Sequence, residues 1–490
     1  MSIADWLRII IEGTLAPTIA YSLLLSGAVL AMWIGSAVEH RDRTRNGMVE
    51  DFAATASSRY CLPVSIVASA YNEETMILAS VRSLLAQDYP EFEVIVVNDG
   101  STDRTLELLQ NAYKLYPDTT VHPDILPHRS LGSVQVSEVD RRLIVVTKEN
   151  GGNKADAMNC GINFARYPYL CSVDGDTVYY PDAILKTMAP VNHAPDEVVG
   201  VTSFFGNSRA PETADHDGGG KRTVDRHFLS VFQHLDLMRS FIATRLSWSR
   251  LNCMMCNPGG FAIWRREEFM QLGGFSNAFS CEDLELTFRM HEKCRREGRR
   301  YRILSLPGMV ARTEGPERVS SLVRQRARWQ KVVLEVVWHY RGMLMRPRYG
   351  SVGMVALPYF ILFEALAPLM QVFSLLSLGG AIALGMFDWP LYACMVGIVT
   401  FGGAIGGAVA VSLHDRGYRD YRLYDLARMF LIGPFDLFYF RPVIMVAGLR
   451  GTWQFFKGDR GWDKFERNTR AATPPDAGAA DASPVQASTL

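Results

Sequence analysis

The chain has 490 residues, which is long enough for two or three domains. Basic and acidic residues number 51 each, so the formal net charge is zero and no basic field favours nucleic acid as a partner. Hydrophobic residues make up 48% of the chain, but they are concentrated in a few long runs near both ends. This distribution predicts a soluble domain flanked by membrane segments.

An uncharged stretch occupies residues 15–38, near the N-terminus. It is long enough to cross a hydrocarbon core of about 30 Å, and it exceeds the core of a cleaved signal peptide, which has about 7–15 residues. Arg41, Arg43 and Arg45 follow directly, and clustered basic residues mark the cytoplasmic end of a membrane helix. The eight cysteines are scattered, which fits a reducing compartment. We therefore expect a multi-pass protein of the inner (plasma) membrane with its soluble domain in the cytoplasm.

Residues 63–345 have the pattern of a soluble α/β domain. Short β-branched runs such as VSIVAS, FEVIVVND, LIVVT and YLCSVD accompany helical stretches at residues 74–87 and 103–115. Strands that alternate with helices predict a mainly parallel sheet whose ligands bind at the carboxyl ends of the strands. The segments 117–142 and 208–222 are polar and are broken by proline or glycine, so we expect surface loops there.

Three apolar blocks follow, at residues 355–387, 391–413 and 429–449. The third contains Asp436 and Arg441, and ionisable groups at membrane depth usually pair or face a polar path. Three spans would place the C-terminal tail outside the cell, whereas its many basic residues favour the inside. Both topologies stay open at this point.

These patterns divide the chain into five parts. The predicted parts are an N-terminal transmembrane helix with its cytoplasmic flank (1–45), a cytoplasmic α/β domain (46–320), an amphipathic interface helix (321–350), a C-terminal transmembrane region (351–450), and a basic interfacial segment with a tail (451–490). The residues after 470 are rich in alanine, proline, threonine and serine, a composition that is typical of disorder.

The sequence YLCSVDGDTVYYPD places Asp174 and Asp176 after a short apolar run. Side chains two residues apart on an extended segment point to the same side, so these carboxylates should converge. Like charges at that separation repel one another unless a cation lies between them. The pattern therefore favours a bound cation, although an isolated D-x-D is more often an acidic turn.

Further motifs lie in the same domain. They are Ala70-Tyr71-Asn72-Glu73 and Asn98-Asp99-Gly100-Ser101 after the first two strands, GGNKADAMN with Lys154 and Asp156, Cys281-Glu282-Asp283 at a helix start, and QRARW with Gln325, Arg328 and Trp329. Each has a simpler explanation: NDGS is a good turn, acidic residues stabilise a helix start, and an Arg/Trp-rich helix can lie on membrane lipid headgroups. Their joint occurrence in this order favours a shared function.

The order A-Y-N-E, N-D-G-S-T-D, N-G-G-N-K-A-D-A-M-N, D-G-D, E-D and Q-x-x-R-W resembles that of the processive, membrane-embedded family 2 glycosyltransferases. These are the inverting synthases of cellulose, chitin, hyaluronan and poly-N-acetylglucosamine. The resemblance covers residues 63–329. It implies an α/β GT-A (nucleotide-diphospho-sugar transferase) fold, a UDP-sugar donor and a growing glycan as the acceptor.

The resemblance also implies roles for individual residues. Asp174 and Asp176 would hold Mg²⁺ or Mn²⁺ against the donor diphosphate, since hard divalent ions prefer carboxylate and phosphate oxygens. Asp283 would be the general base, with Glu282 beside it. The UDP-sugar would be bound by Tyr71, Glu73, Asp99, Lys154, Asp156, Asp174, Gln325, Arg328 and Trp329, and the indole would also stack on the acceptor's terminal sugar.

The identity of the sugar rests on analogy. The form NGGNKADAMN resembles the chitin, hyaluronan and poly-N-acetylglucosamine branch, which favours UDP-N-acetylglucosamine over UDP-glucose. Two positions depart from the family pattern: Cys281 stands where many relatives have threonine, and Gln330-Lys331 stands where many have a glycine. The run CMMCNPGGF at residues 253–261 fits either an acceptor-side loop or a tight turn. The alternatives are a non-processive enzyme that glycosylates a lipid, and a transporter or scaffold with an inactive domain.

Overall fold

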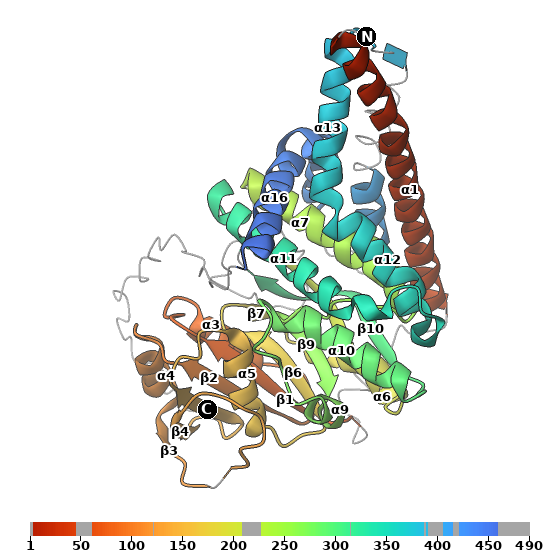
Figure 1. Cartoon of the computed structure of the whole chain (residues 1–490). Coiled ribbons are helices and arrows are strands. Elements are labelled where there is room, and N and C mark those ends of the chain that lie inside the picture. Colours follow the sequence, from red (N-terminus) through yellow and green to blue (C-terminus); the bar gives the residue numbers. More distant parts are fainter. Residues whose placement is uncertain are drawn as a thin grey trace, which may run out of the picture.

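The computed structural model describes residues 3–45, 61–120, 122–207, 227–313, 315–386, 389–390, 405–414 and 421–458. The loop predicted at residues 208–222, the tail after residue 470, and residues 391–404 of the second apolar block lie outside the described residues. Within the described part, a mixed α/β domain carries a group of helices that project away from its sheet (Figure 1).

The described strands form one ten-stranded sheet in the order β3-β4-β5-β2-β1-β6-β9-β8-β10-β7. The strands are β1 (Val64–Ala70), β2 (Phe92–Asp99), β3 (Leu115–Pro117), β4 (Leu131–Ser137), β5 (Leu143–Lys148), β6 (Tyr169–Asp174), β7 (Val178–Tyr179), β8 (Val198–Asn207), β9 (Phe261–Arg265) and β10 (Arg302–Thr313). Strands β5, β2, β1 and β6 are parallel neighbours, so their carboxyl ends meet at one edge of the sheet. Strand β9 pairs antiparallel with both β6 and β8, so its first residue, Phe261, lies at that edge.

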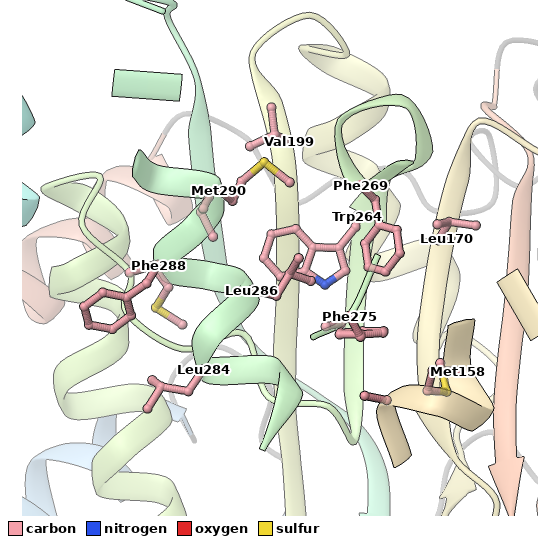
Figure 2. Packing of buried hydrophobic residues seen from close by; sticks show 14 of the residues in the cluster. Met158, Leu170, Val199, Trp264, Phe269, Phe275, Leu284, Leu286, Phe288 and Met290 are labelled. Carbon is pink, nitrogen blue, oxygen red and sulfur yellow. The ribbon is translucent and has the colours of Figure 1, made fainter. Parts of the chain in front are cut away.

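Helices cover both faces of the sheet. One face carries α3 (Ile77–Leu85), α4 (Thr105–Tyr113) and α6 (Ala183–His193), and the other carries α5 (Lys154–Asn163), α9 (Arg266–Gln271) and α10 (Glu282–Arg296). Each face of the sheet has its own hydrophobic core: the first lies under α3, α4 and α6, and the second under α5, α9 and α10. Neighbouring strand residues point to opposite faces, so Ile66 packs into the first core and Val67 into the second. Figure 2 shows the second core, in which Trp264 of β9 lies near Phe269 and Phe275.

Three predicted boundaries in this domain need correction. The first two helices are shorter than the predicted segments 74–87 and 103–115. Helix α4 starts at Thr105. Asp103 lies before the helix, where its Oδ1 accepts a hydrogen bond of 3.0 Å from the Thr105 amide. The prediction of a loop over residues 117–142 was wrong for β4. There Val134 and Val136 alternate with polar residues and pack against the core, which is the pattern of a half-buried strand.

The helices beyond the sheet include candidates for membrane spans. Among the described residues, Arg8–Arg43 and Leu423–Lys457 are long and apolar enough to cross a membrane, and a third candidate, Val352–Ala365 with Ala367–Ala383, is bent by 51°. The first of these is part of α1 (Ile3–Arg45), which runs beside α13 (Ala367–Ala383) away from the sheet (Figure 1). The helix predicted near the N-terminus is therefore present.

A layer of helices lies between the sheet and the projecting helices (Figure 1). It contains α7 (Phe228–Met238), its π-helical continuation η1 (Arg239–Arg245), α8 (Leu246–Arg250), α11 (Val319–His339) and α12 (Leu357–Phe360). Chain segments α15 (Leu423–Ile432), η7 (Asp436–Phe440) and α16 (Arg441–Lys457) follow, and α16 packs along α11. The QRARW motif lies on α11, as predicted, and Asp436 pairs with Arg441 at 2.9 Å.

Candidate active site

The DGD motif lies where β6 ends. Asp174 is the last residue of the strand and Asp176 follows in the turn. The Tyr179 hydroxyl accepts a hydrogen bond of 3.1 Å from the Asp174 amide and donates one of 2.9 Å to the Gly260 carbonyl, which fixes the turn against the start of β9. Partial burial raises the pKa of Asp174, Lys154 opposes the rise, and the nearby Asp176 adds to it. The two carboxylates therefore interact, although Asp176 lies in the turn after β6 and not on the extended segment that the sequence argument assumed.

Lys154, at the start of α5, contacts this acidic turn. Its ammonium group donates to Oδ1 of Asp174 and, at 2.8 Å, to the Gly259 carbonyl, and it lies 3.9 Å from Oε1 of Glu282. Burial alone would lower the pKa of Lys154, but the carboxylates of Asp174 and Glu282 raise it above its ordinary value. Lys154 therefore joins the DGD turn to the ED motif.

Asp283 lies in the first turn of α10 and its carboxylate is held by three donors. Its Oδ2 accepts a hydrogen bond of 2.8 Å from the Gly259 amide. Its Oδ1 accepts one of 2.6 Å from the Leu284 amide and one of 3.1 Å from the Cys281 thiol. Donors on both oxygens fix the carboxylate's orientation.

The glycine pair Gly259-Gly260 measures how closely the two acidic motifs approach one another. A Cβ on Gly259 would lie 3.0 Å from Oε1 of Glu282 and 3.2 Å from Nζ of Lys154. A Cβ on Gly260 would lie 3.1 Å from Oδ2 of Asp174. The chain therefore passes between the DGD and ED motifs at a point where a Cβ would make tight contacts with side chains of both, so the two motifs are neighbours.

Asp99 and Asp156 meet at a buried lysine. Nζ of Lys148 lies 2.6 Å from Oδ1 of Asp99 and 2.5 Å from Oδ2 of Asp156, and its side chain has no exposed surface. The Gly151 amide adds a hydrogen bond of 3.2 Å to Asp99. Burial raises the pKa of Asp99, while Lys148 opposes the rise. Lys148 at the end of β5 thus pairs inside the protein with Asp99 at the end of β2 and with Asp156 on α5.

The loops after β1 and β2 form one rim. The Asn72 amide donates a hydrogen bond of 3.0 Å to Oγ of Ser101, and the Thr102 amide donates one of 2.8 Å to Oδ1 of Asn72. On this rim the Tyr71 side chain is 37% exposed, whereas Glu73 is buried. Tyr71 is therefore available to a ligand from solvent, and Glu73 lies beneath the rim.

A cavity of about 730 Å³ opens between the sheet domain and α11. Gln325 and Arg328 line it from α11, and Gly152 and Asn153 line it from the turn before α5. The basic residues of the lining are Arg324, Arg328, Lys331, Arg341 and Arg450. Glu335 also lines the cavity and pairs with Lys331 at 3.6 Å, so the remaining arginines leave an excess of positive charge that suits an anionic ligand such as a diphosphate.

The loop before the ED motif is fastened to α11. Glu335 accepts a hydrogen bond of 2.9 Å from the Ser280 amide and one of 2.8 Å from its hydroxyl. On the same helix Trp329 is 39% exposed, and the guanidinium carbon of Arg326 lies 4.3 Å from the centre of its indole ring. Helix α11 therefore carries the QRARW side chains and also fixes the approach to Asp283.

The DGD pair fits a divalent ion that arrives with its ligand. Among the described residues, no group of three or more His, Cys, Asp or Glu side chains is arranged to hold a metal ion. The Asp174 side chain is 37% exposed, so one of the two carboxylates is open to solvent. Magnesium at nucleotide sites is typically bound by one or two protein carboxylates, and phosphate oxygens and water complete its shell. Asp174 and Asp176 match that donor set.

A family model described as Glycosyltransferase like family 2 matches residues 63–331, a span that contains all of these motifs. The chain belongs to this family. Among curated relatives, this glycosyltransferase is 24% identical to the poly-beta-1,6-N-acetyl-D-glucosamine synthase of Staphylococcus aureus (strain COL) and 23% identical to that of Staphylococcus epidermidis, over 314 residues in each case. These matches cover 64% of this chain and 63% of each relative, so the chain spans less than two thirds of the relatives' length.

The fold has a counterpart among solved structures. The mannosyltransferase PcManGT from Pyrobaculum calidifontis, in complex with GDP-Man and Mn²⁺, superposes with a TM-score of 0.53 at 18% identity, covering 91% of this chain and 99% of that one. At this identity the likeness concerns the fold alone. The expected α/β GT-A fold of the glycosyltransferase is confirmed.

Sequence reasoning missed two groups that organise the site. Lys148 ends the β-branched run LIVVTK, and a lysine that closes a buried strand is a signal for an internal ion pair. Glu335, ten residues after Gln325, gave no signal, because its partner Ser280 belongs to a separate loop. Within CMMCNPGGF the tight turn is present, since the Phe261 amide donates a hydrogen bond of 3.1 Å to the Pro258 carbonyl across Gly259 and Gly260, and an acceptor-side role stays a prediction.

Proposed function

We propose that this glycosyltransferase is an inverting, processive enzyme that polymerises a β-linked polysaccharide from a UDP-sugar and passes it across the membrane. UDP-N-acetylglucosamine is favoured over UDP-glucose. The observation that carries the proposal is the meeting of the DGD and ED motifs at Gly259-Gly260. The similarity to poly-beta-1,6-N-acetyl-D-glucosamine synthases supports the choice of sugar and the β linkage.

The donor would lie across the carboxyl ends of the parallel strands. Tyr71, Glu73 and Asp99 would form the uridine end, with Asp156 acting through Lys148 beneath it. Gln325 and Arg328 would face the diphosphate from α11, since a planar guanidinium pairs well with phosphate oxygens. A Mg²⁺ or Mn²⁺ ion bound by Asp174 and Asp176 would act as a Lewis acid that neutralises charge on the departing UDP.

Asp283 is the general base in this proposal. Its carboxylate takes the proton from the acceptor hydroxyl while that oxygen forms a bond to the anomeric carbon. The bond from the anomeric carbon to UDP breaks, and its electron pair leaves with UDP. Attack from the face opposite UDP converts an α-linked donor into a β-linked product. Gly259 and Leu284 hold the base in one orientation, and Lys154 balances the charge of Glu282 and Asp174.

The membrane arrangement is part of the proposal. The sheet domain would lie in the cytoplasm beneath a multi-pass region in the plasma membrane. This orientation is supported by Arg41 and Arg43 near the C-terminal end of α1, because basic residues mark the cytoplasmic end of a span. That end lies beside the soluble domain, since Asp42 pairs with Arg250 at 2.7 Å.

The proposal is tested with the full chain purified in detergent. UDP release is measured with Mg²⁺ or Mn²⁺ and a panel of UDP-sugars, and the product is sized and digested with linkage-specific hydrolases. We expect UDP release with UDP-N-acetylglucosamine and a long β-linked polymer. A short lipid-linked product would support the non-processive alternative instead. The absence of turnover with every UDP-sugar would overturn the proposal and favour a transporter or scaffold.

A further inference from the structure

Arg326 lies inside the QRARW motif but has a different environment from Gln325 and Arg328. Its side chain is only 13% exposed, and its Nη2 lies 2.9 Å from Oδ2 of Asp236 on α7. Its guanidinium carbon lies 4.3 Å from the centre of the Trp329 ring, within the range of a cation–π contact. One guanidinium group therefore contacts both an anchoring carboxylate and the indole.

The Asp236 carboxylate, which pairs with Arg326, also pairs with an arginine of another helix. Oδ1 of Asp236 lies 3.3 Å from Nη2 of Arg441, at the start of α16. Nε of Arg441 lies 2.9 Å from Oδ2 of Asp436, which also pairs with Arg239 at 2.7 Å. These ion pairs form one chain of alternating charges that ends at Arg326. The chain connects four helical segments: α7 with η1, α11, η7 and α16.

The backbone that carries Arg326 is also fixed. A Cβ on Gly451 of α16 would lie 2.2 Å from the carbonyl oxygen of Ala327, so the two helices approach at a point where only glycine fits. Nε2 of Gln330 donates a hydrogen bond of 2.9 Å to the Ala365 carbonyl. Helix α11 therefore packs closely against α16 and is hydrogen-bonded to the Ala365 carbonyl next to the segment that carries Arg326 and Trp329.

We propose that Arg326 is a positioning residue for the acceptor sugar. In this arrangement Asp236 anchors the guanidinium against one face of Trp329, so that the ring presents its open surface to the terminal sugar of the acceptor glycan. The inference rests on the proposed function, in which Trp329 stacks on that sugar. It adds that the acceptor site is set by a charge chain reaching from α11 to the membrane-side helix α16.

A misplaced acceptor has a specific consequence. If the donor site is intact but the acceptor hydroxyl is poorly held, water takes its place and UDP is released without growth of the glycan. The number of UDP molecules released per sugar incorporated into polymer therefore reports on acceptor positioning. A loss of folded protein would lower both quantities together and leave this ratio unchanged.

The test uses the full-length protein in detergent with UDP-N-acetylglucosamine and Mn²⁺. Arg326→Gln is expected to raise the ratio of UDP released to sugar incorporated about tenfold and to shorten the product, because the ion pair and the cation–π contact are both lost. Arg326→Lys, which keeps the charge, should restore most of the coupling. Arg296→Gln, which breaks an exposed pair with Glu292, is the matched control and should leave the ratio unchanged.

A double-mutant cycle identifies Trp329 as the group through which Arg326 acts. Trp329→Ala should raise the same ratio, and Arg326→Gln should add little to it in the double variant. Additive effects in the double variant would overturn the inference, and so would an Arg326→Gln variant with an unchanged ratio. Neither result would affect the proposed function, which UDP release by the wild type supports. If Arg326→Gln does not accumulate in membranes, Asp236→Asn takes its place, and an unchanged ratio in that variant overturns the inference equally.

Discussion

The backbone amide of Gly259 donates a hydrogen bond of 2.8 Å to Oδ2 of Asp283. The carbonyl of the same residue accepts a hydrogen bond from Lys154, which also contacts Asp174. A single residue of the CMMCNPGGF loop thus touches the proposed general base on one side and the partner of the proposed metal ligand on the other. Gly259 therefore contacts Asp283 directly through its backbone amide, and it is linked to Asp174 through the Lys154 side chain.

The Asp283→Asn variant tests the role of the base. Asparagine keeps the shape of the side chain but cannot accept the acceptor's proton, so we expect transfer to fall by about 10²–10⁴-fold. UDP binding, measured by calorimetry, should stay close to that of the wild type. Asp196→Asn, at an exposed position away from the site, is the control. Transfer within a few-fold of wild type in Asp283→Asn would assign the base to another residue.

The DGD pair is expected to control the dependence on divalent ions. Asp174→Asn and Asp176→Asn each remove a carboxylate ligand, so Mn²⁺ should no longer strengthen UDP binding in either variant. Calorimetric titration of UDP with Mn²⁺ and with a chelator measures this directly. Asp182→Asn, eight residues beyond Asp174 and paired with Lys186, should bind UDP and Mn²⁺ as the wild type does. Full Mn²⁺ stimulation in the Asp174→Asn variant would remove Asp174 from the metal site.

Lys148 is expected to be required for stability. Lys148→Met leaves Asp99 and Asp156 buried without their cation, a change that typically costs about 3–5 kcal/mol. Thermal unfolding of the purified protein should show a lower Tm, and adding Asp156→Asn should recover part of the loss because one of the two like charges is removed. Lys186→Met, at a more exposed pair, is the matched control. A double variant no more stable than Lys148→Met would argue against charge repulsion as the cause.

The sequence was sufficient for the parts of the site that lie at strand ends. The alternation of strands and helices placed Asp99 and Asp174 at the same edge of the sheet. Asp176, which was expected on an extended segment, lies in the turn after β6. The start of α10 at Glu282 was equally readable, because acidic residues at a helix N-terminus form a local pattern.

What the sequence could not provide were contacts between distant segments. The carbonyl and amide of Gly259 reach Lys154 and Asp283 only because β9 runs antiparallel beside β6, and no periodicity in the sequence specifies that pairing. The direction of Asp156 is a similar case. Its place in GGNKADAMN suggested a ligand contact, which stays a prediction; its carboxylate, on α5, pairs with Lys148 at the end of β5, and no local pattern indicated that pairing.

Cys281 is expected to act as a neutral hydrogen-bond donor to the base. Burial raises the pKa of its thiol well above the ordinary value, and the nearby Asp283 raises it further, so the thiol keeps its proton at neutral pH. Its Sγ lies 3.1 Å from Oδ1 of Asp283. Cys281→Ala should lower transfer about two- to tenfold, the range for one lost hydrogen bond. Cys281→Thr and Cys281→Ser keep a donor and should retain most activity, and if all three variants behaved alike the thiol would have no such role.

Glu268, remote from the site, provides a test of the electrostatics of the fold through its dependence on pH. Burial by itself would raise the pKa of Glu268, but Lys293 and Arg299, each with a contact of 2.5 Å, lower it below its ordinary value of 4.5. The folded state therefore favours the carboxylate, and this stabilisation is present above the unfolded-state pKa and is lost as the pH falls through the lowered folded-state pKa.

Glu268→Gln should accordingly lower the free energy of unfolding by about 1–3 kcal/mol at neutral pH. The difference in Tm between variant and wild type should shrink at an acidic pH below 4.5, where the wild-type side chain begins to take up its proton. Glu107→Gln, at an exposed pair with Arg104, should change the Tm little at either pH. A Tm difference for Glu268→Gln that stayed constant across this range would mean that packing, rather than charge, accounts for the contribution of Glu268.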